Sequence, residues 1–253
     1  SALKEKTLKG GPSLTILDGV KFFGVLAMTA DHTGYFFFPD DLWWRVAGHA
    51  GPPSFWFFLL GFSRKRIVDR LLIIYAVVML VQFLLLGMPL LPLNIFISFI
   101  ICRLWVNLCE KRGWFEKPIA ITLLSLAALP LMLPADHWFI QYGSAGMLYA
   151  MLGHQVRAGR KTGVYILALA AAACVLLSYF YWWQLSLLQG GILVTTTLAL
   201  SLFLVHLRND VIVKDWTKSW TMTGIAILCR NTIHYFYFHL LLLNILWLAL
   251  QHH

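Results

Sequence analysis

Long apolar runs separated by short polar segments make up most of this chain. One of them, residues 71–91, reads LLIIYAVVMLVQFLLLGMPLL. A helix that crosses a membrane needs about 20 consecutive, mostly apolar residues, so the pattern predicts about nine spanning helices. They are expected at residues 14–38, 46–63, 67–88, 92–109, 118–134, 138–156, 163–183, 187–206 and 221–250.

The composition favours the same interpretation. The 253 residues are 60% hydrophobic and 12% charged, whereas about 25% of the residues of a soluble domain are charged. In lipid every backbone polar group must be bonded internally, and a β-barrel would show short alternating segments instead of long apolar runs. We therefore predict an all-α, polytopic membrane helical bundle, with residues 1–13 as a cytoplasmic segment and 14–253 as one transmembrane domain.

The charges of the loops predict the orientation. Every even-numbered loop is basic and every odd-numbered loop is acidic or neutral. The first loop carries Asp40 and Asp41, and the second carries Arg64, Lys65, Arg66 and Arg70. Because basic loops stay in the cytoplasm, we expect a multipass membrane protein with a cytoplasmic N-terminus and no cleaved signal peptide. The last run is interrupted at residues 230–231, so it is either one tilted helix or a short re-entrant piece followed by a span.

Two classes of function are disfavoured. The formal net charge of +9 belongs to the loops, and no basic run is interleaved with aromatic residues in a polar domain, as nucleic-acid binding would require. The four cysteines lie in apolar runs without a CxxC pair, which indicates neither a disulfide framework nor a metal site.

The stretch MTADHTGYFFFPDD, residues 28–41, carries an adjacent carboxylate and imidazole near the end of the first run. Ionisable groups at membrane depth are costly and usually functional. In a helix Lys21, Met28 and Asp31 share one face, with His32 on its flank. Either Asp31 and His32 cap the helix at the interface, or His32 is a general base whose charge is tuned by Asp31.

Polar residues in the second and last runs are further candidates. RVAGHAGPPSFWFF is either a broken helix that brings Arg45 and His49 toward His32 or a plain turn before a helix. In CRNTIHYFYFHLLLL one helix face holds Asn231, Tyr235 and His239, and a neighbouring face holds Arg230 and His234. These side chains line a polar cavity or are bonded core residues.

Two isolated positions allow two interpretations each. Asn94 follows Pro92 in LPLNIF and is either a helix N-cap or a site residue. Tyr142 precedes Gly143 and Gly146 in QYGSAGM, where small residues also serve close helix packing.

Five motifs in order along the chain carry a family resemblance. They are Lys21 with Met28, Asp31 and His32; RVAGHAGPPSFWFFLLGF; LNIFISF; QYGSAGMLY; and YFYFHLLLL. With these motifs the chain resembles the TraX family, the F-pilin acetylase family of conjugation systems, which is distantly similar to multipass acyltransferases. The chain has His49 where the family usually has Arg.

The resemblance implies an inner-membrane N-acetyltransferase that uses acetyl-CoA and no metal, with a conjugative pilin subunit and membrane lipid as partners. An α-amine has a pKa of about 7.7–8.0, so neutral His32 is a plausible base, oriented or tuned by Asp31. The predicted substrate-binding residues are Arg45, His49, Asn94, Tyr142, Arg230, Asn231, His234 and His239. The predicted CoA-phosphate ligands are Arg64, Lys65, Arg66 and Arg70.

Two other functions remain open. A base beside a buried peptide terminus also suits head-to-tail cyclisation of pilin, which needs no CoA. Ser54 is the nearest candidate nucleophile by sequence for that reaction. The second alternative is a non-enzymatic chaperone for pilin. The mass of the pilin separates acetylation from cyclisation, because the first adds an acetyl group and the second loses water.

Overall fold

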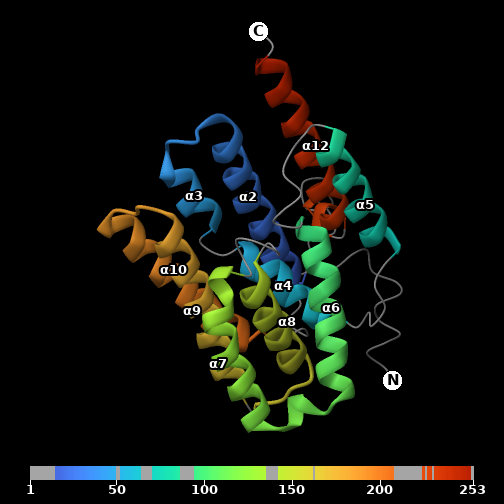
Figure 1. The fold of residues 1–253 in the computed structure, drawn as a ribbon, viewed down its shortest axis with the longest axis vertical. Coiled ribbons are helices and arrows are strands. Elements are labelled where there is room, and N and C mark those ends of the chain that lie inside the picture. The colour runs from blue at the N-terminus through green and yellow to red at the C-terminus, as the bar shows by residue number, and fades with distance from the viewer. Residues whose placement is uncertain are drawn as a thin grey trace.

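The fold is helical throughout the part of the chain that the computed structural model describes (Figure 1). The described residues are 15–49, 52–63, 70–85, 94–134, 142–161, 163–207, 224–225, 227–229 and 231–251. They contain no β-strand, which confirms the all-α prediction.

The described residues form eleven helices, one of them a 3-10 turn. In chain order they are α2 (Ile16–Phe37), α3 (Leu42–His49), α4 (Pro52–Phe62), α5 (Arg70–Leu85), α6 (Ile95–Lys111), η1 (Trp114–Glu116), α7 (Pro118–Pro134), α8 (Gly143–Arg157), α9 (Val164–Trp182), α10 (Leu187–Val205) and α12 (Thr232–Gln251).

Most helices follow the predicted runs, and the second run is the main exception. It consists of two helices, α3 and α4, and not of one helix over 46–63. Proline lacks a backbone N–H and fits only the first turn of a helix, so Pro52 and Pro53 begin α4 and prevent α3 from continuing. In the last run, Asn231 forms a bend directly before α12. Whether the piece before this bend is re-entrant stays a prediction.

Two helical segments, Val164–Tyr181 and Leu187–Val205, are long and apolar enough to cross a membrane. Shorter apolar segments occur at Arg70–Leu85, Pro118–Pro130 and Thr232–Trp247. The count of nine spans therefore remains a prediction.

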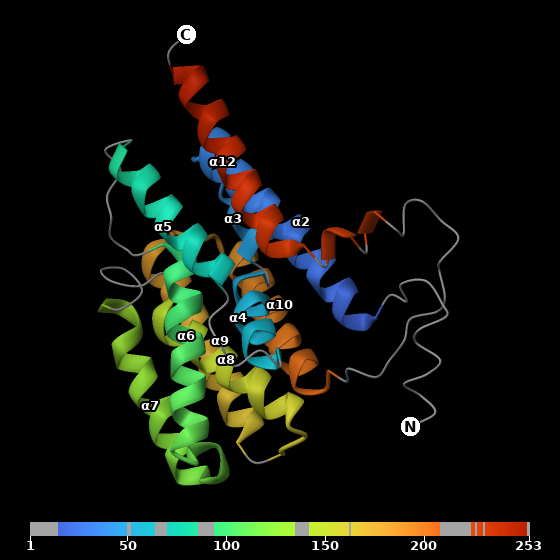
Figure 2. The same cartoon turned by 90° about the vertical axis from the view of Figure 1, so that its right-hand side faces the viewer.

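Glycines bring α4 and α8 into direct backbone contact at the centre of the bundle (Figure 2). A Cβ on Gly61 would lie 1.8 Å from the carbonyl oxygen of Ala150, and one on Gly153 would lie 2.0 Å from that of Phe58. A Cβ on Gly146 would lie 2.8 Å from the Phe57 ring. The small residues that the sequence shows in this part of the chain therefore do serve close packing, as small residues do between membrane helices.

Helices α2 and α3 form a hairpin of equally close contact. A Cβ on Gly34 would lie 2.2 Å from Cβ of Trp44, and one on Gly48 would lie 2.1 Å from Cβ of Asp31. Helix α12 runs beside α2 in both ribbon views. The hairpin and α12 together surround the second half of α2, which carries Asp31.

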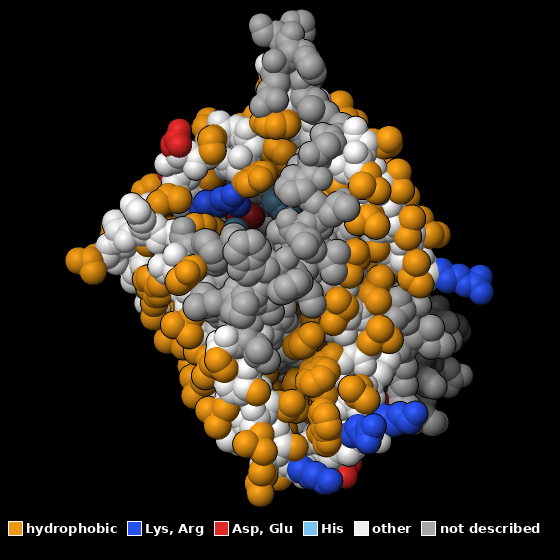
Figure 3. All heavy atoms as spheres, in the orientation of Figure 1, with side chains coloured by type: hydrophobic (Ala, Val, Ile, Leu, Met, Phe, Trp, Pro, Cys, Tyr) orange, Lys and Arg blue, Asp and Glu red, His pale blue; other side chains and the backbone are white. Residues whose placement is uncertain are grey.

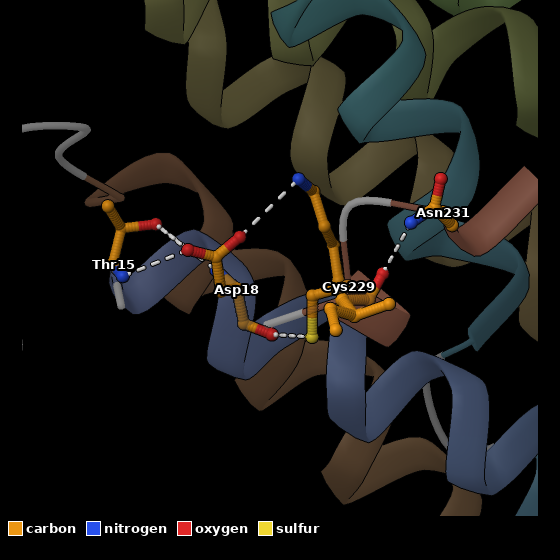
Figure 4. Close-up of polar contacts among 6 residues, drawn as sticks. Thr15, Asp18, Cys229 and Asn231 are labelled. Carbon is orange, nitrogen blue, oxygen red and sulfur yellow. Dashed lines mark hydrogen bonds and ion pairs between the residues drawn. The ribbon is translucent and has the colours of Figure 1, made fainter. Parts of the chain in front are cut away.

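The beginning of α2 is held by local bonds (Figure 4). Thr15 and Asp18 form a capping box, and Nζ of Lys21 lies 3.7 Å from the Asp18 carboxylate. The thiol of Cys229 donates to the backbone carbonyl of Asp18 at 3.0 Å. The polar residues at this end of the helix are therefore used in capping and in contact with the residues before α12.

Candidate functional site

Predicted polar side chains on α2, α3 and α12 and directly before α8 meet in one cluster, here called the histidine cluster. It consists of Asp31, His32, Arg45, His49, Tyr142 and His239. In the upper half of Figure 3, blue, red and pale-blue atoms meet in a hollow among orange and grey atoms. Two sets of contacts start from the adjacent residues Asp31 and His32.

The first set surrounds the carboxylate of Asp31. Nη1 of Arg45 donates to its Oδ1 at 2.8 Å, and Nδ1 of His49 lies 3.0 Å from the same oxygen. The guanidinium of Arg45 lies over the ring of Tyr35, 4.7 Å from its centroid. The side chain of Asp31 is only 10% exposed, and a buried charge persists only when it is paired. Close approach at Gly48 makes this pairing possible, because no side chain separates α3 from Asp31.

The surroundings of His49 fix the position of its proton. Nδ1 faces two acceptors, the Asp31 carboxylate and the carbonyl oxygen of Arg45 at 3.1 Å, so this nitrogen carries the hydrogen. In the neutral ring Nε2 is then an acceptor, and the hydroxyl of Tyr142 lies 3.3 Å from it. The rings of Tyr179 and Trp183 make T-shaped contacts with the His49 ring at centroid distances of 5.0 and 4.7 Å.

The second set of contacts joins His32 to α12. Nδ1 of His32 lies 2.7 Å from Nε2 of His239, and Nδ1 of His239 lies 3.1 Å from the carbonyl oxygen of Tyr235. A carbonyl only accepts, so Nδ1 of His239 is the donor there and its Nε2 accepts from Nδ1–H of His32. In this neutral arrangement Nε2 of His32 keeps a lone pair. The chain of bonds therefore defines which nitrogen of His32 is basic.

A further bond fixes α12 against α2. The hydroxyl of Thr29 donates to the carbonyl of Val25 at 2.8 Å, so the hydroxyl of Tyr235 donates to Thr29 Oγ1 at 3.0 Å. The ring of Phe236 meets His32 edge-on at 5.9 Å. These contacts hold the turn of α12 that carries His239.

The side chains of Asp31 and His32 bond to different helices. In the described contacts the Asp31 carboxylate bonds with α3, and the hydrogen-bond partner of His32 is His239. The two side chains leave α2 in different directions, as neighbours in a helix do.

Asn94 is the N-cap of α6, one of its two predicted roles. Its Oδ1 accepts from the backbone N–H of Phe96 and Ile97 at 3.1 and 3.2 Å, and its amide donates to the carbonyl of Ala76 at 3.2 Å. Its polar atoms are thus engaged in joining α6 to α5, and the structure does not bring it to the histidine cluster.

The other predicted residues lie apart from the cluster or outside the description. His234 pairs with the hydroxyl of Tyr75 on α5. Asn231 is exposed just before α12, and its amide donates to the carbonyl of Ile227 at 2.9 Å (Figure 4), so its role in substrate binding stays a prediction. Arg70 is exposed at the first position of α5. Four predictions, Arg64, Lys65, Arg66 and Arg230, lie outside the described residues.

Sequence reasoning missed the aromatic walls of the site. Tyr35 and Trp183 border Arg45, Trp183 and Tyr179 border His49, and Tyr75 bonds His234. These residues sit in apolar runs like many others, and no spacing distinguishes them before the helices are paired. In the described ranges, no three His, Cys, Asp or Glu side chains are grouped to hold a metal ion.

A family model described as TraX protein matches residues 16–246. The chain belongs to the TraX family. Membership relates the protein to pilin in conjugation, and the matched range includes the whole histidine cluster. Comparison with curated proteins and with solved structures gave no match.

Proposed function

We propose that this protein is an inner-membrane acyltransferase that moves an acetyl group from acetyl-CoA to the N-terminal amine of a conjugative pilin subunit. TraX membership supports pilin as the partner. The observation that carries the chemistry is the hydrogen-bonded chain from His32 through His239 to the carbonyl of Tyr235, because it leaves a basic nitrogen on His32.

In this mechanism Nε2 of His32 takes the proton of the pilin amine as the amine forms its bond to the acyl carbon. General-base catalysis of this kind contributes about 10²–10⁴-fold. His239 accepts from Nδ1–H of His32 and stabilises the imidazolium that forms. The carbon–sulfur bond then breaks, and CoA leaves as the thiolate.

Arg45 acts on the acceptor side. Its side chain is 20% exposed beside the buried Asp31, so its charge faces the hollow as well as the carboxylate. A nearby cation favours the neutral form of an amine, which is the nucleophilic form. Asp31 serves this step by fixing Arg45 and His49, while His32 is oriented from α12.

The membrane location rests on the surface of the bundle. Large apolar side chains are exposed on several helices, among them Leu85 at 81%, Ile119 at 75% and Leu187 at 98%, and orange atoms cover much of the face in Figure 3. Soluble proteins rarely expose contiguous apolar areas of this kind. In a membrane these side chains would contact lipid and not water. Acetyl-CoA would then reach the protein from the cytoplasm, where its phosphates would bind Arg64, Lys65, Arg66 and Arg70.

The intact mass of pilin co-expressed with this protein and without it tests the proposal. We expect pilin made with the protein to be heavier by one acetyl group located on the N-terminal residue. A product lighter by one water would instead establish head-to-tail cyclisation. If the pilin mass is unchanged and less pilin accumulates without the protein, the protein is a chaperone. This outcome and the loss of water each reject acetylation.

A further inference from the structure

A second hydrogen-bonded chain lies on the other side of Asp31, and the general-base mechanism does not use it. Asp31 accepts from Nδ1–H of His49, and Nε2 of His49 accepts from the hydroxyl of Tyr142. This order of carboxylate, imidazole and hydroxyl is the arrangement by which hydrolases activate a nucleophilic hydroxyl. It draws the proton of Tyr142 toward His49.

The backbone of Tyr142 supports a reactive role independently. Its φ of 62° makes it the one non-glycine residue with a positive φ in the described ranges. A bulky side chain in this region is a genuine outlier, costs about 1–3 kcal/mol, and is typical of active sites. Helix α8 begins at the next residue, so Tyr142 lies on a strained turn into a helix. The nucleophile of the α/β-hydrolases is presented on a similar turn.

The two chains of bonds start from consecutive residues of α2. The carboxylate of Asp31 bonds Arg45 and His49, and His32 is the next residue. The hydroxyl of Tyr142 is held by His49, whose ring is buried. The Asp31 carboxylate, which Arg45 holds in place, would stabilise the positive charge of a protonated His49.

We infer that Tyr142 accepts the acyl group before the pilin amine does, so that the direct transfer described above is divided into two steps; the inference rests on the proposed acyl transfer from acetyl-CoA to pilin. The phenolic oxygen forms the bond to the acyl carbon and the carbon–sulfur bond breaks. His49 takes the phenolic proton at Nε2 and passes it to the thiolate, which leaves as free thiol. The pilin amine then attacks the tyrosyl ester, the carbon–oxygen bond breaks, and the amine's proton passes through Nε2 of His32 to the phenolate oxygen.

The division of work between the two histidines makes the step testable. The full-length protein is incubated in lipid nanodiscs with radiolabelled acetyl-CoA and no pilin, quenched in acid, digested and analysed by mass spectrometry. We expect one acetyl group on Tyr142. Adding a peptide with the N-terminus of mature pilin moves the label to the peptide. His49→Gln fails to acquire the label, whereas His32→Ala acquires it and fails to pass it on.

Variants of two tyrosines on and beside α8 provide the matched comparison. Tyr142→Phe removes the hydroxyl and is expected to lose the label and to slow acetylation of the peptide on the order of 100-fold or more. Tyr149→Phe removes a buried hydroxyl that bonds Ser201 at 2.7 Å and is expected to keep the label. Thermal unfolding of each variant shows that it is folded.

Two outcomes overturn the inference in different ways. Acetylated pilin with no label on Tyr142 and full activity of Tyr142→Phe rejects the tyrosyl ester and leaves direct transfer to the amine. Absence of acetylated pilin with the wild-type protein rejects the proposed function and the tyrosyl ester with it.

Discussion

Asp31 and His32 are neighbours in sequence and work with different partners. The Asp31 carboxylate is bonded to Arg45 and His49 of α3, and His32 is bonded to His239 of α12. Adjacent side chains on a helix point about 100° apart, so one pair of residues on α2 organises two sides of the site. The basic nitrogen of His32 then depends on a residue more than two hundred positions away.

Substitution of His239 tests that dependence. His239→Phe keeps a ring and removes the acceptor for Nδ1–H of His32. The tautomer of His32 with its hydrogen on Nε2 then becomes available, and it has no basic Nε2. We expect kcat for acetyl transfer to fall on the order of 100-fold or more, with little change in KM for acetyl-CoA. His239→Gln keeps an acceptor oxygen and is expected to retain more activity. Equal activity of the Phe and Gln variants would show that His239 only fills space.

Much of this site follows from the sequence, and its bonding does not. Asp31, His32, Arg45, His49, Tyr142 and His239 are all predicted from ionisable or polar residues in apolar runs, and the structure joins them. Which histidine faces which acceptor depends on the rotation of three helices about their axes. A one-dimensional pattern does not contain those angles, so Asp31 is assigned to its neighbour His32 instead of to His49.

The α2–α3 hairpin positions the site through glycine. Gly34 and Gly48 allow the two helices to touch, and Gly48 lies directly against Asp31. Helix lengths are readable from the sequence because apolar runs, prolines and the Asn94 cap mark them. The pairing of α2 with α12 is not readable, since every apolar run is an equally suitable neighbour before packing is known.

Adding one methyl group tests the hairpin. Gly48→Ala would place its Cβ 2.1 Å from Cβ of Asp31, and forcing extra volume into a packed contact costs about 1–3 kcal/mol. We expect a lower unfolding temperature in detergent together with loss of acetyl transfer. Gly19→Ala is the control on α2: its Cβ meets nothing within 4 Å, and alanine favours a helix over glycine by up to about 1 kcal/mol. Equal unfolding temperatures of the two variants would contradict the close contact.

The ends of the bundle differ in charge. Figure 1 places the connection from α6 to α7 at the lower end and the α2–α3 turn in the upper part. The lower connection carries Lys111, Arg112 and Lys117, and the upper turn carries Asp40 and Asp41. Basic connections face the cytoplasm in inner-membrane proteins, so we predict that the upper turn lies on the outer side.

Cysteine labelling in intact cells tests this orientation. Asp41→Cys is exposed in the α2–α3 turn and is expected to react with a membrane-impermeant maleimide added from outside. Lys111→Cys at the end of α6 is expected to react only after the inner membrane is opened. The native cysteines are buried, so the unsubstituted protein serves as the control. Labelling of Lys111→Cys in intact cells, with Asp41→Cys protected, would reverse the topology.

The central claim is that Nε2 of His32 is the base for acetyl transfer to a pilin amine. The most direct measurement is the rate at which purified protein acetylates a mature pilin N-terminal peptide from acetyl-CoA, compared between wild type, His32→Ala and His206→Ala. His206 is an exposed histidine bonded to Leu202 and Tyr165 and serves as the control. We predict that His32→Ala loses about 10²–10⁴-fold in rate while His206→Ala keeps it. An undiminished rate in His32→Ala would contradict the claim.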